Sequence, residues 1–182
     1  ELSEEKELVQ RAENDMLTGV LNKKTMEKRV SLMLKNRGDK YVIFYMVDLD
    51  NFKNVNDTLG HIYGDQAIVE TAQCLNKVFA NQDCIGRLGG DEFAVCVSYQ
   101  AFDEQGLLEF IGKKAQEICA GNRRTYTDNA ASVSITSSIG VAYAPDMGDS
   151  FTELYTQADC ALYYSKANGK DQYHIYSPKD DN

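Results

Sequence analysis

The feature that most constrains the fold is the segment YVIFYMVD at residues 41–48, in which seven consecutive apolar or aromatic residues precede an aspartate. A continuous run of this kind, rich in β-branched and aromatic side chains, is typical of a central strand that is buried on both faces. We therefore expect a sheet with this segment at its centre.

The periodicity of the flanking segments predicts the elements around this strand. Strands are expected at 84–88 and 92–98, which form a hairpin, and at 133–143 and 172–176. Asn22 is a predicted N-cap, and Ser150 with Glu153 a predicted capping box. Five segments have apolar residues at helical spacing: Leu8, Val9, Ala12 and Met16; Met26, Val30, Met33 and Leu34; Ile68, Ala72, Leu75 and Phe79; Leu107, Ile111, Ala115 and Ile118; Leu154, Ala158, Ala161 and Leu162.

From Tyr41 onward the predicted order is strand, helix, strand, strand, helix, strand, followed by a further helix and strand. The first six elements form the split βαβ arrangement of ferredoxin-like folds, in which an antiparallel sheet carries helices on one face. The fold class is therefore α+β. No linker rich in Gly, Ser or Pro divides the chain, so we expect one domain at 16–182, preceded by a lead-in linker helix at 1–15.

Composition excludes several classes of function. The net charge is −9, so we expect no nucleic-acid partner. No apolar run approaches the roughly 18 residues of a membrane span, so we expect no membrane contact by this domain. The five cysteines lie scattered in apolar segments, which favours reduced core residues in a cytoplasmic protein. The chain begins ELSEEK without methionine, so we expect an N-terminal sensor or regulatory region in a longer protein, which could itself be membrane-attached.

Four carboxylates are expected to gather in this fold. The central strand ends VDLD, which places Asp48 and Asp50 on one face, and the hairpin turn carries Asp91 and Glu92. Because the strand and the hairpin are neighbours in a split βαβ sheet, these groups would crowd into a small volume unless a cation neutralised them. Such oxygen ligands suit magnesium. Alternatively, the first pair caps the next segment and the second decorates a solvated turn; the spacing alone leaves both interpretations open.

The motifs around these residues resemble those of a known family. The segment DLDNFKNVNDTLGHIYGDQAIVE, with DMLTGVLN before it and RLGGDEF after it, is closely similar to the GGDEF family of diguanylate cyclases. The resemblance covers about Asp15 to Tyr176. It implies a palm-like α+β domain, similar to nucleotidyl cyclases, that condenses two GTP into cyclic di-GMP and two pyrophosphates in bacterial second-messenger signalling.

The resemblance also implies roles for the acidic residues. Asp48, the backbone carbonyl of Leu49, and Asp91 would hold two magnesium ions together with Glu92, and manganese can substitute. Either Asp91 or Glu92 would assist deprotonation of the ribose 3′-hydroxyl. Lys53 would stabilise the charge that builds on the phosphoryl oxygens, although it could instead be a solvated loop lysine.

Further residues would bind the triphosphate. Phe52 and its neighbours would offer backbone N–H groups to the β and γ phosphates. Lys166 and Lys170, in ALYYSKANGK, would contact the terminal phosphates, or as an alternative would only complement the dipole of the preceding helix. At the second of these positions the family often has arginine, so the charge is kept while the bidentate fork is lost.

The resemblance also implies which residues bind the guanine base and which leave room for the nucleotide at the hairpin turn. Asn56 and Asp65 match the base-reading pair of the family, since a carboxylate accepts well from guanine N–H groups. Alternatively, Asp65 is the N-cap of the helix that carries Ile68, and Asn56 is a loop residue. His61 would order this loop or touch the nucleotide. Gly89 and Gly90 would leave room for the nucleotide to approach the backbone.

Three expectations concern regulation and assembly. Many family members have an inhibitory product site, Arg-x-x-Asp, but here the window reads Ala80-Asn81-Gln82-Asp83, so we expect weak or absent product inhibition. Because the product joins two guanylates symmetrically, turnover requires a facing homodimer. The main alternative is a catalytically silent module that binds GTP or a protein partner, and a further one is a different nucleotidyl cyclase or polymerase-like palm.

Overall fold

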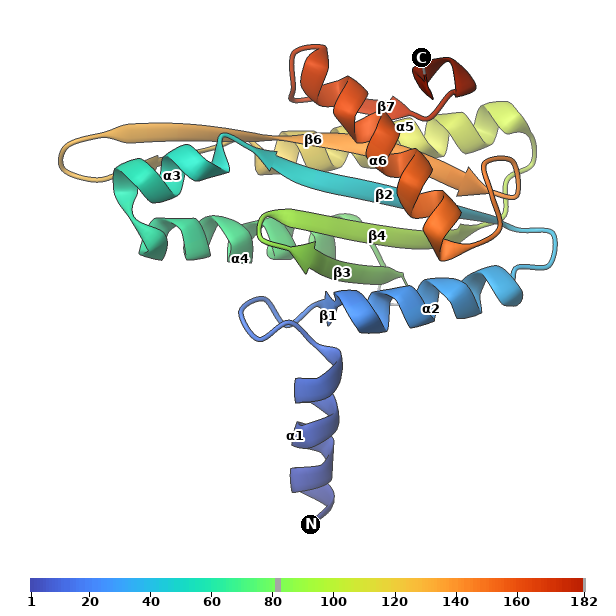
Figure 1. Ribbon diagram of the computed structural model, residues 1–182, viewed down its shortest axis with the longest axis horizontal. Helices are drawn as coiled ribbons and strands as arrows, with labels where there is room; N and C mark the ends of the chain where they lie inside the picture. The colour runs from blue at the N-terminus through green and yellow to red at the C-terminus, as the bar shows by residue number, and fades with distance from the viewer. Residues whose placement is uncertain (81–82, 182) are drawn as a thin grey trace.

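The computed structural model describes residues 1–80 and 83–181, and its centre is the strand that the apolar run predicts (Figure 1). This strand, β2 (Tyr41–Asp50), pairs antiparallel with β4 on one edge and with β6 on the other. Residues 42–47 are completely buried. The sheet order is β1-β3-β4-β2-β6-β5, with β7 also paired to β6. The other strands are β1 (Leu21–Asn22), β3 (Cys84–Gly89), β4 (Glu92–Tyr99), β5 (Arg124–Thr127), β6 (Ser132–Ala144) and β7 (Tyr173–Ile175).

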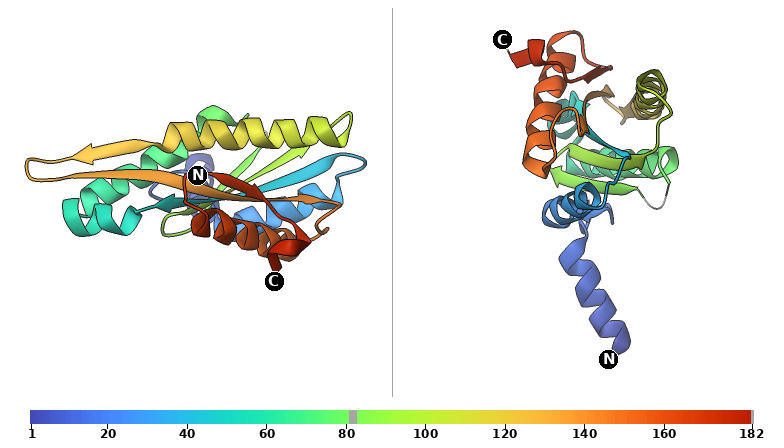
Figure 2. Two further views of the ribbon diagram at one scale, coloured as in Figure 1. Left: turned by 90° about the horizontal axis from the view of Figure 1, so that it is seen from above. Right: turned by 90° about the vertical axis from the view of Figure 1, so that its right-hand side faces the viewer.

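The helices cover both faces of the sheet (Figure 2). They are α1 (Leu2–Glu13), α2 (Lys23–Lys35), α3 (Phe52–Leu59), α4 (His61–Val78), α5 (Glu104–Asn122) and α6 (Phe151–Ala167), with a 3₁₀ turn at Pro178–Asp181. Ile43 and Tyr45 of β2 pack with the core residues of α4 and α5, whereas Phe44 and Met46 pack with those of α2 and α6. The split βαβ order is confirmed, and its two helices share one face as expected. The opposite face is equally apolar along β2, and therefore needs the cover that α2 and α6 provide.

Local capping explains where several helices begin. The side chain of Asn22 accepts a hydrogen bond from the backbone N–H of Thr25 at 3.0 Å, which confirms the predicted N-cap of α2. The hydroxyl of Ser150 accepts from the N–H of Glu153 at 3.2 Å at the start of α6. The carboxylate of Glu153 accepts from the N–H of Asp149 and not from that of Ser150, so the predicted capping box is displaced by one residue.

The lead-in helix is shorter than its predicted stripe. It ends at Glu13, and Met16 is exposed in the turn that follows. The carboxylate of Asp15 accepts hydrogen bonds from both the backbone N–H and the hydroxyl of Thr18, and this local turn competes with helix continuation. The helix α1 extends away from the rest of the domain and contributes no buried residue (Figure 1).

The helix α3, the short strands β1 and β5 and the 3₁₀ turn were not anticipated from the sequence. The polar segment after β2, expected to be a loop, contains α3, which buries only Val55 completely and packs Phe52 and Leu59 partly against the core. The short strand β5 pairs with the first residues of β6. None of the described helices combines the length and the apolar character that crossing a membrane requires.

Candidate active site

The end of β2 and the tip of the β3–β4 hairpin meet as predicted. Asp48 stands directly opposite Glu92 in the antiparallel pairing, and the N–H of Leu49 donates to the carbonyl of Asp91 at 3.3 Å. Of the four predicted acidic residues, Asp48 and Asp91 line a hollow of about 450 Å³, whereas Asp50 and Glu92 are not in its lining. The hollow is lined by Asp48, Leu49, Asn51, Phe52, Lys53, Asn54, Asp57, Asp91 and Lys166.

Lys166, near the end of α6, lies among the acidic residues. Its Nζ is 2.8 Å from Oδ1 of Asp50, 3.2 Å from Oδ2 of Asp48 and 3.3 Å from the carbonyl oxygen of Leu49. The predicted phosphate-binding lysine therefore rests on carboxylates in this structure. The hydroxyl of Ser165, the residue before Lys166, donates to the carbonyl of Ile139 on β6 at 2.8 Å. This bond fixes the end of α6 against the sheet, and so helps to place the ammonium of Lys166 in the site.

Asp50, one of the four carboxylates expected to crowd together, is held by hydrogen-bond donors of the protein. It is buried, and it accepts hydrogen bonds from the hydroxyls of Thr136 and Ser138 and from the N–H of Asp171, in addition to Lys166. Burial alone would raise the pKa of Asp50, but these donors and the charge of Lys166 hold the pKa below its ordinary value. Asp50 thus lies near Asp48, as expected, with Lys166 between them, but protein donors already saturate its two oxygens, so it offers none to a cation.

Asp48 remains in an electrostatically unfavourable position. Burial and the charges of Asp91 and Glu92 raise the pKa of Asp48 to about 6, although Lys166 opposes the shift. Burial and the charge of Asp159 raise the pKa of Glu92. Such crowding favours the binding of a cation.

The donor set fits magnesium when the nucleotide contributes ligands. Oδ2 of Asp48 and the carbonyl oxygen of Leu49 converge on one cationic atom, the Nζ of Lys166, so both point toward a single position. Among residues 1–80 and 83–181, no three His, Cys, Asp or Glu side chains are grouped as metal ligands. Magnesium requires no such cage, because it is commonly held by one or two carboxylates with water and phosphate oxygens.

The hollow also contains the start of α3. Asn51 precedes this helix in the left-handed conformation, with φ of 69°, and its side chain donates to the carbonyl of Ser134 at 3.0 Å. The N–H groups of Phe52 and Lys53 begin the helix, where intrahelical acceptors are lacking and the helix dipole is positive. The Lys53 side chain is exposed. This end of α3 is suited to an anion such as phosphate.

The predicted base-reading residues lie on the α3–α4 hairpin, outside the lining of this hollow. The side chain of Asn56 packs over Gly64, where a Cβ would lie 1.8 Å from Oδ1 of Asn56. Asp65 is exposed beside it, and His61 is the exposed first residue of α4. The alternative role of Asp65 as the helix N-cap is wrong, because Gly60, with φ of 92°, ends α3 and immediately begins α4.

The glycines and the remaining lysine lie at exposed turns. A Cβ at Gly89 or at Gly90 would meet no atom within 4 Å, which is consistent with the expected room for a ligand. Sequence reasoning missed Arg87, whose Nε donates to the carbonyl of Gly90 at 2.8 Å and whose guanidinium pairs with Asp15 at 3.3 Å. Lys170 is exposed after α6 with φ of 61° and does not line the hollow.

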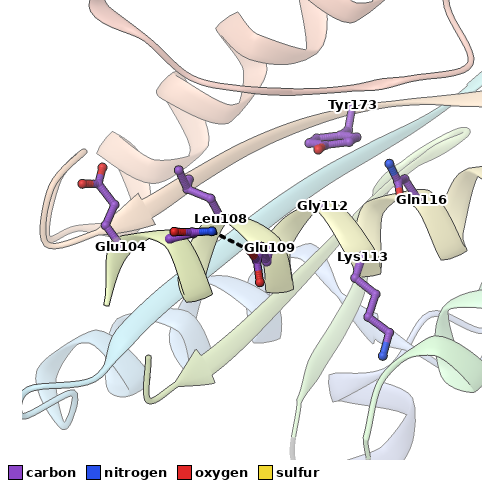
Figure 3. Close-up of a pocket in the computed structure, with 8 residues that line it drawn as sticks. Glu104, Leu108, Glu109, Gly112, Lys113, Gln116 and Tyr173 are labelled. Atoms are coloured by element: carbon purple, nitrogen blue, oxygen red, sulfur yellow. Dashed lines mark hydrogen bonds between the residues drawn. The ribbon is translucent and has the colours of Figure 1, made fainter. Parts of the chain in front are cut away.

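Two other surface features are separate from this site. Asp83 accepts from the N–H of Ala80 at 3.0 Å, while residues 81 and 82 of the product-site window lie outside the described residues. A hollow of about 700 Å³ on the exposed side of α5, where Tyr173 lies over Gly112, contains none of the predicted site residues (Figure 3).

Comparisons with known proteins agree with this geometry. The family described as "Diguanylate cyclase, GGDEF domain" matches residues 12–172. The cyclic di-GMP phosphodiesterase PdeR of Escherichia coli is 30% identical over 92% of this chain and 24% of its own length. The bifunctional diguanylate cyclase/cyclic di-GMP phosphodiesterase MucR of Pseudomonas aeruginosa is 33% identical over 94% of this chain and also 24% of its own length.

Solved structures show the same fold. The coiled coil and GGDEF domain of DgcB from Caulobacter crescentus, crystallised with c-di-GMP, superposes with a TM-score of 0.83 at 28% identity. The match covers 96% of this chain and 91% of that one. The chain spans about a quarter of the length of the curated relatives that it matches. This chain belongs to the GGDEF domain family of diguanylate cyclases.

Proposed function

We propose that this domain condenses two GTP into cyclic di-GMP and two pyrophosphates. The observation that carries the proposal is the meeting of Asp48, Asp91 and Lys166 in one hollow at the start of α3. Carboxylates for a cation and positive groups for a triphosphate thus lie side by side. A domain that bound only a protein partner would gain nothing from the electrostatic cost of burying Asp48 beside other carboxylates.

The phosphates would be held by the positive side of the hollow. The first N–H groups of α3 at Phe52 and Lys53 would donate to the β and γ phosphates. The ammonium groups of Lys166 and Lys170 would contact the terminal phosphates, and Lys53 would stabilise the charge that develops during transfer. These positive groups orient the α-phosphate for attack along the axis of the bond to pyrophosphate.

The acidic side would hold the cation and accept the proton. Asp48, the carbonyl of Leu49, and Asp91, with Glu92 beside them, would bind magnesium or manganese, which supplies Lewis-acid charge at the phosphate when bound. The chain offers two acceptors for the proton of the attacking 3′-hydroxyl, Asp91 and Glu92. The 3′-oxygen then bonds to the α-phosphorus of the second nucleotide, and the bond to pyrophosphate breaks.

Guanine recognition is assigned to the α3–α4 hairpin. Asn56 and the exposed carboxylate of Asp65 are close in this hairpin, since Asn56 packs over the neighbouring Gly64. A carboxylate that accepts from the N1–H and the exocyclic amine of guanine selects it over adenine. His61 lies at the same helix junction and would order it.

Turnover requires two domains that face each other. One domain has one hairpin, but each guanylate must both donate a 3′-hydroxyl and be attacked, which demands a two-fold arrangement. The exposed residues Leu8 and Val9 of α1 would hold two chains in register. The DgcB structure, which includes a coiled coil with its GGDEF domain, supports this assignment. The sensor or regulatory region would precede α1 in a longer protein that works in the cytoplasm.

The decisive experiment is incubation with GTP and magnesium, followed by chromatographic separation of the products. Cyclic di-GMP supports the proposal. Unchanged GTP with measurable binding would instead support a silent module, a function for which the similarity to the phosphodiesterase PdeR is the supporting observation. Asp91→Ala is the control: it should form no product while melting at or above the wild-type temperature, because it removes like-charge repulsion from the turn.

The assembly is tested by dilution. Specific activity should rise with protein concentration, and fusion of a parallel coiled coil before Glu1 should raise it further. A protein shown to be monomeric by ultracentrifugation, with constant specific activity over a wide range of dilution, would contradict the facing homodimer.

A further inference from the structure

The ammonium of Lys166 is engaged by three protein oxygens in this structure, through two hydrogen bonds and one further ion pair. A lysine ammonium has three N–H donors. Three protein oxygens lie within reach of Nζ: Oδ1 of Asp50 at 2.8 Å, Oδ2 of Asp48 at 3.2 Å and the carbonyl of Leu49 at 3.3 Å. Two of the three donors are therefore held by Asp50 and Leu49 and the ammonium is also attracted to Asp48, so a phosphate must compete with these oxygens for Lys166.

Asp50 is the acceptor that is held most firmly. Its side chain is only 4% exposed. Oδ2 accepts from the hydroxyl of Thr136 at 2.6 Å and from the N–H of Asp171 at 3.2 Å, while Oδ1 also accepts from the hydroxyl of Ser138 at 2.7 Å. Rotation of this carboxylate would leave several buried donors unpaired, so Asp50 stays in place.

The other two acceptors are the proposed ligands of the divalent cation. The side chain of Asp48 is 23% exposed and forms an ion pair with Lys166, while its acidic neighbours Asp91 and Glu92 repel it. The carbonyl of Leu49 faces the same ammonium. A monovalent ammonium and a divalent cation cannot both occupy the position on which these two oxygens converge, because they repel each other and compete for the same lone pairs.

We propose that Lys166 has one permanent partner, Asp50, and two exchangeable partners, Asp48 and the carbonyl of Leu49. In the nucleotide-free domain its ammonium occupies the cation position. When the site loads, Lys166 gives up the exchangeable partners and directs the freed N–H donors to the phosphates, while Asp50 keeps it in the site. Asp50 is thus a positioning residue that acts through Lys166. The assignment of the cation and phosphate ligands in this inference rests on the proposed function.

The exchange is tested by manganese binding to the nucleotide-free protein, measured from the electron paramagnetic resonance signal of free Mn²⁺. Lys166→Met should bind Mn²⁺ about tenfold more tightly than wild type, because the competing ammonium is gone. Lys53→Met is the matched control, since Lys53 lines the same hollow and carries the same charge but makes no ion pair among the described residues. Equal affinities for the two variants would overturn the exchange.

The positioning role is tested by a double-mutant cycle on the binding of a non-reactive GTP analogue with a methylene bridge between the α and β phosphates, measured by calorimetry. Asp50→Asn should weaken binding in the wild-type background and have no further effect in Lys166→Met. Ser138→Ala, which removes one hydrogen bond but leaves the charge of Asp50, should bind as wild type. Equal weakening by Asp50→Asn in both backgrounds would overturn the role.

The experiments can refute the proposed function and the exchange of Lys166 partners independently of each other. If the folded wild-type protein binds no guanine nucleotide, the proposed function and the positioning role are both wrong. The manganese series uses no nucleotide, so it still decides whether Lys166 and a divalent cation compete for Asp48 and Leu49. Melting temperatures of each variant, measured by circular dichroism, identify any loss of fold.

Discussion

Replacement of Gly140 by alanine is expected to push α6 outward from the sheet and to destabilise the domain. Gly140 lies on β6, where it pairs with β2 and faces the backbone of α6. A Cβ at this position would lie 2.0 Å from the carbonyl oxygen of Ala158 and 2.3 Å from the nitrogen of Leu162. Both atoms belong to the helix backbone, so no side-chain rotation relieves the contact, and the helix must move outward by more than about 1 Å.

The expected cost is at the upper end of overpacking effects, about 3 kcal/mol of unfolding free energy. For a domain of this size, that corresponds to a melting temperature lower by roughly 6–12 °C. The displacement would also stretch the bond from Ser165 to the carbonyl of Ile139, now 2.8 Å, and carry Lys166 away from Asp50. Nucleotide binding should therefore weaken together with stability.

Urea denaturation followed by circular dichroism measures the free energy, with Gly112→Ala as the matched control. A Cβ at Gly112 would lie 2.7 Å from the hydroxyl of Tyr173, which is the end of a flexible side chain (Figure 3). Alanine inside α5 also gains about 1 kcal/mol of helix propensity, so the control should be neutral or more stable. A Gly140→Ala protein within about 0.5 kcal/mol of wild type would refute the backbone-contact argument.

Three other predictions concern separate regions. The hydroxyl of Tyr45 is buried without a hydrogen-bond partner among the described residues, so Tyr45→Phe should unfold in urea with equal or up to about 1 kcal/mol greater free energy, and a clear loss would reveal a partner. Burial alone would raise the pKa of Asp15, but hydrogen bonds from Thr18 and the charge of Arg87 lower it overall. The stabilisation by Asp15 is therefore present above the unfolded pKa of about 3.9 and is lost as the pH falls through the lower folded pKa. In urea titrations from about pH 6 to pH 2, the free energy of unfolding should decline less steeply for Asp15→Asn than for the wild type. Parallel curves for the two proteins would exclude the effect. Low micromolar cyclic di-GMP should not slow pyrophosphate release in a coupled assay, and a slowing relieved by Asp83→Ala would show that a product site persists.

Local patterns in the sequence determine most of the elements that carry the site. The apolar run at 41–47 demands cover on both faces, and two apolar runs joined by a glycine turn specify a hairpin, because both signals act between neighbouring residues. The side chain of Asn22 reaches an N–H only three residues away, so its capping role could be predicted as well. The order of elements then limits the topology enough to bring Asp48 opposite Glu92.

Prediction was weaker where local signals are sparse or ambiguous. The helix α3 has Phe52, Val55 and Leu59 at helical spacing, but it is only eight residues long and its other residues are polar, so a pattern this short is not distinguished from a loop. Asp65 has the chemistry of an N-cap, but α4 begins at His61, directly after Gly60 and four positions before Asp65. A capping side chain acts only where the backbone actually starts the helix, which composition alone does not reveal.

Only the tertiary structure decided which partners the charged groups take. Asp48 and Asp50 lie on one face of the same strand, so the sequence treats them as equivalent carboxylates. The pairing of β2 with β6 places Asp50 opposite Thr136, and the close approach of α6 at Gly140 brings Lys166 between the two aspartates. Thr136 and Lys166 lie 86 and 116 positions from Asp50 along the chain, beyond the reach of any local periodicity. Asp50 is therefore held by protein donors, whereas Asp48 keeps oxygen atoms available for a cation. Strand register and helix packing determine which donors reach each of them.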